Sequence, residues 1–199
     1  AALTRDDDGG TDRFLLPNEQ ALFDACVRNP PGHEHGFEYG LVNAREALYR
    51  HLPRANAPNK IRPEAQIVVI VATDEVPQSF SEFLAGSEHE CQLEGATQTK
   101  LQAAITPYLR IFKGEVDPDT KTIFHVLGGV CNGGCGADVA HGYRELAQQL
   151  DGQVGDICQS DLGYTLQSII NSIVGAVSPV VLEHEPVASS LAVALDGVA

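Results

Sequence analysis

The chain has 199 residues, of which 43% are hydrophobic, and this is enough for one ordinary domain with a core of its own. Its 27 acidic and 13 basic residues give a formal charge of −14, which repels a phosphate backbone and anionic lipid headgroups and speaks against nucleic acid as a partner. No apolar run approaches the roughly 18 residues of a membrane-spanning helix, so we expect no direct membrane span.

The first half of the chain predicts two helices and one strand. Residues 18–28 form a short helix capped by Asn18, and the prolines and glycines of 29–36 end it. Residues 37–52 place apolar side chains at helical spacing. A loop over 53–63 leads to the apolar run 67–73, IVVIVAT, which is typical of a strand buried on both faces in the middle of a parallel sheet.

The second half continues the alternation of helix and strand. We expect a helix over residues 97–112, kinked or divided by Pro107, then a buried strand over 121–130 and a third helix over 138–150. A short strand over 152–158 follows, and then a helix that is capped by Ser160 or Asp161 and ends at about residue 174. This order favours an α/β fold with a doubly wound, mostly parallel sheet flanked by helices. We place that domain in residues 1–178 and a C-terminal β extension in 179–199.

Two carboxylates follow the apolar strand, and they are the first candidates for a functional site. Asp74 and Glu75 lie where the strand ends, and ligands of such sheets bind at the carboxyl ends of the strands. Clustered carboxylates suit hard cations such as Mg²⁺ or Ca²⁺, and Glu34, His35 and Glu38 are predicted to reach the same rim. The structural alternative is that Asp74 or Glu75 caps the next helix.

Motifs of common enzymes are missing from the sequence. It contains no Gly-x-Ser-x-Gly, no phosphate-binding loop with lysine and no His-Glu-x-x-His, which favours a binding protein over an enzyme. The five cysteines favour disulfides in an oxidising compartment over cytosolic thiols. Cys131 and Cys135 are too widely spaced for a Cys-x-x-Cys pair, and the glycines around them allow one sulfur to reach Cys158.

Several segments together resemble the von Willebrand factor type A domain, which has the integrin I-domain fold, and in particular its secreted or surface-exposed bacterial members. They are HGFEYGLVNAREAL, IVVIVATDEVPQS, HGYRELAQQLDGQVGDIC, LQSII and SPVVLEHEP, in that order. The resemblance implies an adhesion or protein-binding module whose divalent cation is held by three loops. Asp74 falls on the third loop, and His35 or Glu38 stands near the second, where the family has threonine.

The first loop of that family, Asp-x-Ser-x-Ser, and the strand before it are not found in this sequence. Either an upstream fragment of the same polypeptide supplies them, or the site is degenerate and the domain is a metal-free structural subunit of an extracellular assembly. The odd number of cysteines favours the upstream fragment: Cys26 would pair with a cysteine of that fragment, and Cys135–Cys158 and Cys91–Cys131 disulfides would use the other four. The resemblance also implies a secreted or cell-surface location, with lipid anchoring through a preceding segment as one form.

Overall fold

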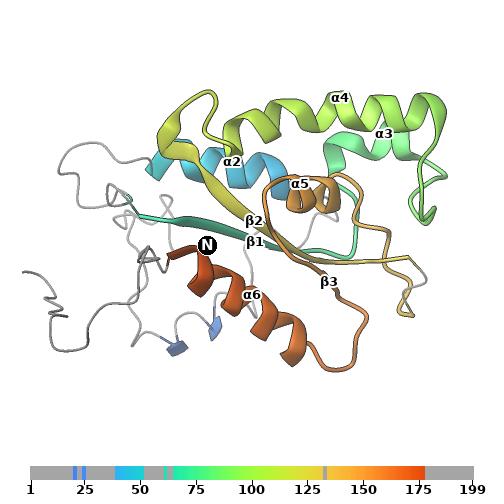
Figure 1. Cartoon of the computed structure of the whole chain (residues 1–199). Helices are drawn as coiled ribbons and strands as arrows, with labels where there is room; N and C mark the ends of the chain where they lie inside the picture. Colours follow the sequence, from blue (N-terminus) through green and yellow to red (C-terminus); the bar gives the residue numbers. More distant parts are fainter. Residues whose placement is uncertain are drawn as a thin grey trace, which may run out of the picture.

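The computed structural model describes residues 20–21, 24–25, 39–51, 61, 65–131 and 134–177. Within this part of the chain the protein is a mixed α/β structure built on a three-stranded parallel sheet (Figure 1). The strands are β1 (Ile67–Ala72), β2 (Thr122–Gly128) and β3 (Val154–Asp156). Their order is β1-β2-β3, with Ile67 opposite Thr122 and Val126 opposite Val154. The predicted α/β class and parallel pairing are confirmed.

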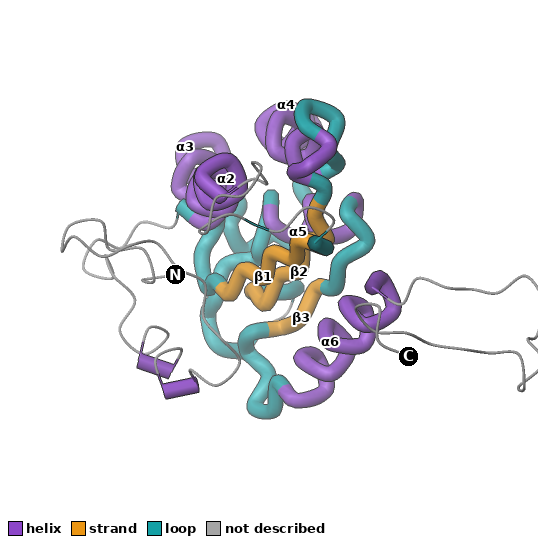
Figure 2. Tube along the Cα trace, turned by 90° about the vertical axis from the view of Figure 1, so that its left-hand side faces the viewer, coloured by secondary structure: helices purple, strands orange, loops and turns teal. Residues whose placement is uncertain are grey.

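Helices lie on both faces of this sheet. The described helices are α2 (Gly40–His51), η4 (Gln78–Phe80), α3 (Ser81–Leu84), α4 (Gly95–Phe112), η5 (Pro118–Thr120), α5 (Tyr143–Gln149) and α6 (Gly163–Val177). Figures 1 and 2 show α2, α3 and α4 on one side of the strands and α6 on the other. Because the three strands are parallel, their carboxyl ends lie at the same edge of the sheet, where the connecting loops begin.

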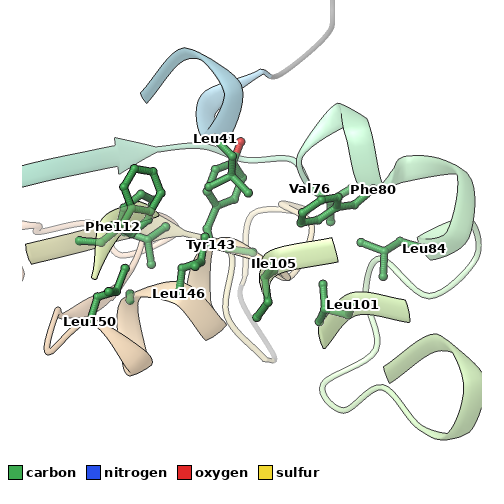
Figure 3. Packing of buried hydrophobic residues seen from close by; sticks show 14 of the residues in the cluster. Leu41, Val76, Phe80, Leu84, Leu101, Ile105, Phe112, Tyr143, Leu146 and Leu150 are labelled. Atoms are coloured by element: carbon green, nitrogen blue, oxygen red, sulfur yellow. The ribbon is translucent and has the colours of Figure 1, made fainter. Parts of the chain in front are cut away.

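The main core fills the space between the sheet and the helices α2–α5. It joins side chains from every one of these elements, among them Leu41, Phe80, Leu101, Phe112 and Tyr143 (Figure 3). Phe112 also packs against Phe124 of β2, with 5.4 Å between the ring centroids. This burial supplies the main driving force for folding, since apolar area removed from water contributes about 25 cal/mol per Å².

The expectation that β1 is buried on both faces is wrong for the part of the chain that the structure describes. Among these residues β1 pairs only with β2 and is the edge strand. Val69 and Val71 pack against the main core, but Ile70 is 49% exposed on the opposite face. The apolar run identified a strand correctly, but it did not specify how many neighbours that strand has.

Two helix predictions differ from the structure, and two other predicted segments are described only in part or not at all. Pro107 does not divide α4, which runs from Gly95 to Phe112. The third helix begins at Tyr143 instead of 138, because Gly129 forms a parallel bridge with Val139 and Gly142 has φ +90°. The predicted helix over 18–28 is helical at the four residues described, and the extension over 179–199 lies outside the described residues.

Gly40 allows α2 to approach α5 closely. A Cβ at this position would lie 2.6 Å from the hydroxyl oxygen and 3.0 Å from Cε1 of Tyr143, which is fully buried. We expect Gly40→Ala to lower the free energy of unfolding by about 1–3 kcal/mol, the usual range for overpacking. Urea denaturation measures it, with Gly175→Ala in α6 as control. Gly175 has open space around its Cβ position, so there alanine should be neutral or stabilising. An equal effect of both substitutions would contradict the argument.

Candidate functional site

The candidate site is the edge of the sheet at which β1, β2 and β3 end. Backbone hydrogen bonds join the loops there: the Asp138 N–H donates to the Asp74 carbonyl oxygen at 2.9 Å, and Ile157 N–H donates to Gly128 at 3.0 Å. The Val139 N–H donates to the Glu88 carbonyl oxygen at 2.8 Å and attaches the segment between α3 and α4 to the same rim. The rim is therefore a connected surface made of four loops.

A tight turn fixes the backbone after β1. The buried Thr73 hydroxyl accepts a hydrogen bond from the Glu75 N–H at 3.1 Å and donates to the Glu75 carbonyl oxygen at 2.9 Å. This turn directs the chain into Val76 and Phe80, which are buried in the core. The proposed capping role of the acids is not observed, because neither η4 nor α3 has a side-chain cap.

Asp74 and Glu75 are both exposed at this turn. The Asp74 carboxylate makes no hydrogen bond or ion pair with another described residue, so it is available to a ligand. The nearby Asp138 carboxylate lies 3.4 Å from Nδ1 of His89. Within the described ranges, no three acidic, histidine or cysteine side chains are grouped as a metal site. The other two predicted metal ligands, His35 and Glu38, lie outside the described residues.

One disulfide fastens the rim. Cys135 in the loop after β2 is bonded to Cys158 in the loop after β3, as expected, with a Cα–Cα distance of 5.2 Å. Cys131 keeps a thiol, whose sulfur lies 3.6 Å from the carbonyl oxygen of Cys91. The expected Cys91–Cys131 disulfide is therefore not formed in this structure, although the two residues are in contact. Cys26 lies outside the described residues.

Beside the rim lies a buried polar group that the sequence did not reveal. His141 is fully buried, and its Nε2 donates to the carbonyl oxygen of Glu90 at 2.8 Å. Nδ1 of His141 faces Glu145 Oε1 at 3.7 Å, and Arg144 Nη2 lies 2.8 Å from the same carboxylate oxygen. The only signal in the sequence is the charged pair Arg144–Glu145 three residues after a histidine, a pattern that is also common on solvated helix faces.

These contacts hold Glu145 in its ionised form. Burial raises the pKa of its carboxyl, but hydrogen bonds from His141, Arg144 and the Gly142 N–H, together with the charge of Arg144, outweigh burial and lower the pKa to about 2. The carboxylate thereby joins the N-terminus of α5 to the loop that carries Glu90 and Cys91.

The histidine of β2 has a structural role. His125 is fully buried, and its Nδ1 accepts a hydrogen bond from the Gln153 N–H at 2.9 Å, just before β3 begins. Burial lowers the pKa of His125 below its ordinary value. These contacts make His125 a residue of the core that joins β2 to the start of β3.

Comparisons of this chain with family models, with curated proteins and with solved structures found no match. In the part of the chain described, no helix combines the length and apolarity needed to cross a membrane.

Proposed function

We propose that this chain is the later part of a von Willebrand factor type A-like module, secreted or exposed on a cell surface, that binds a protein partner through a divalent cation. The observation that carries the proposal is the position of Asp74. Its exposed carboxylate, which has no partner among the described residues, follows a parallel strand at the edge where the loops of the sheet meet. In sheets of this kind, that edge is where ligands bind.

The chemistry of this carboxylate fits Mg²⁺ or Ca²⁺, which prefer oxygen ligands. Asp74 would hold the ion directly or through water, Glu75 would assist from the same turn, and His35 and Glu38 remain the proposed contributors from the preceding segment. A cation held this way attracts an acidic group of the partner, which the chain's charge of −14 would otherwise repel. The proposed activity is adhesion or assembly, without catalysis.

Among the described residues β1 has no neighbour on its outer edge, which supports the second half of the proposal, that a further strand belongs beside it. A groove of about 560 Å³ runs along all six residues of β1 and is closed on its other side by α2, where the small residues Gly40, Ala44 and Ala47 line it. Exposed apolar edges are normally blocked by charge, proline or a bulge, and IVVIVA has none of these. We propose that a preceding segment of the same polypeptide supplies this strand and the first metal-binding loop.

The test of the metal site is titration of the longer polypeptide with Ca²⁺ and Mg²⁺ alone, measured by isothermal titration calorimetry. We expect saturable binding that Asp74→Ala weakens about tenfold or more. Asp119→Ala is the matched control, because Asp119 lies in η5 before β2 and hence at the opposite edge of the sheet. Its substitution should leave binding unchanged.

The competing function is a metal-free structural subunit, and the disulfide between two rim loops favours it, since a fastened loop needs no ion to hold it. Under that function neither ion binds, and partner binding by the longer polypeptide persists in EDTA. Unchanged ion affinity in Asp74→Ala would likewise exclude the proposed role of Asp74.

A further inference from the structure

A second concave surface is lined by residues of α4, of α5 and of the segment before α4, and it shares no residue with the turn after β1. It has a volume of about 360 Å³. Five glutamines, Leu93 and the Arg144–Glu145 pair form its lining; the glutamines are Gln92, Gln98, Gln102, Gln148 and Gln149. We call this surface the glutamine hollow.

The glutamine hollow carries no net charge, although the chain as a whole is strongly acidic. Its one cation and its one anion neutralise each other, since Arg144 Nη2 lies 2.8 Å from Glu145 Oε1. All its other polar side chains are amides. Neither an anion nor a cation would find an unpaired opposite charge here, so the composition favours a neutral, polar ligand.

The glutamine hollow combines an ion pair that is held in place with glutamine amides that are available for hydrogen bonds. Arg144 and Glu145 are only 19% and 12% exposed and are held by the contacts with His141 and Gly142. In contrast, the amides of Gln92, Gln98, Gln102 and Gln148 form no hydrogen bond with other described residues, whereas Gln149 donates to the Glu145 carbonyl oxygen at 3.2 Å. Each amide offers two N–H donors and one acceptor oxygen.

We propose that the glutamine hollow binds a neutral saccharide of one or two rings. Adjacent sugar hydroxyls each donate and accept, and a glutamine amide can serve one of each at the same time. The nearly buried Leu93 gives an apolar contact for the C–H face of a sugar ring. The volume lies at the lower end of the range for small-ligand sites, about 300–1,000 Å³, which sets the limit of one or two rings.

The test is saturation-transfer NMR on the full chain with a panel of neutral sugars: glucose, galactose, mannose, N-acetylglucosamine, maltose, cellobiose and lactose. At least one should bind, with a dissociation constant near or below the millimolar range that a shallow site supports. The double variant Gln102→Ala/Gln148→Ala should weaken that binding about tenfold or more. Both residues are exposed on helices, where alanine is well tolerated.

The matched control is Gln167→Ala, which removes an exposed amide from α6 and should leave sugar binding unchanged. Glucuronic acid should bind more weakly than glucose. The measurement is made in EDTA, so that it does not depend on a cation at Asp74. The proposal is overturned if no sugar of the panel binds, if binding survives the double variant, or if a short alanine peptide binds the hollow in place of the sugars.

Discussion

Removal of the Cys135–Cys158 disulfide should lower the free energy of unfolding by about 3 kcal/mol. The bond closes a segment with a sequence separation of 23, and the loss of chain entropy that such a crosslink imposes on the unfolded state is of that size. Its position adds a local reason. β3 has only three residues and pairs with β2 at three positions, so the strand has few hydrogen bonds of its own to hold it in the sheet.

Urea denaturation of Cys135→Ala/Cys158→Ala, followed by circular dichroism, measures this effect. Cys131→Ser is the matched control, because it removes a thiol four residues away that is not part of a disulfide. Cys131→Ser should lower the free energy of unfolding clearly less than the double variant does. Reduction of the unmodified protein should reproduce the loss. An unchanged urea midpoint after reduction would show that the bond does not contribute to stability.

The strands were the most predictable part of the fold. Ile67–Ala72 and Thr122–Gly128 are runs of apolar and β-branched residues, and the observed strands begin and end within three residues of the predicted bounds. Their parallel pairing followed from the helices between them. The edge position of β1 did not follow, because a run of isoleucine and valine reports low polarity and not the number of neighbouring strands.

Helix bounds were less predictable wherever a tertiary contact decides them. The spacing of Val139, Tyr143 and Leu146 satisfies a helical pattern, but Val139 is held against Gly129 by a bridge. A Cβ at Gly129 would overlap the carbonyl oxygen of Asp138, so this close contact requires glycine. Such a pairing joins two loop residues across a turn of the chain and leaves no periodic signal in either segment.

The sequence predicted where Asp74 lies in the sheet, but not which residues surround it. Asp74 occupies the predicted edge because the end of a strand fixes where the next residue lies. The Thr73 turn, the Asp138 contact and the His141–Arg144–Glu145 group depend on loops meeting in space. Single residues with polar side chains occur throughout any surface, so no pattern in the sequence distinguished His141 from the six other histidines.

The His141–Arg144–Glu145 group also affects how the stability of the protein changes at acidic pH. The carboxyl of Glu145 has a pKa of about 2 in the folded protein against an ordinary value of 4.5. The folded state thus favours the ionised form, and the difference corresponds to about 3 kcal/mol of stability. That contribution is complete above pH 4.5 and is lost as the pH falls towards 2, because the unfolded chain takes up the proton first.

Glu145→Gln should therefore lower the free energy of unfolding at pH 7 by about 2–3 kcal/mol, because the amide cannot balance the partly buried Arg144. The variant should also lose less stability than the parent protein between pH 4.5 and pH 2. Urea denaturation at a series of pH values measures both. Glu115→Gln is the matched control: its ion pair with Arg110 is exposed, and such pairs contribute less than about 1 kcal/mol. Equal losses in the two variants, or parallel pH profiles for Glu145→Gln and the parent, would show that the Glu145 carboxylate does not stabilise the N-terminus of α5 through its charge.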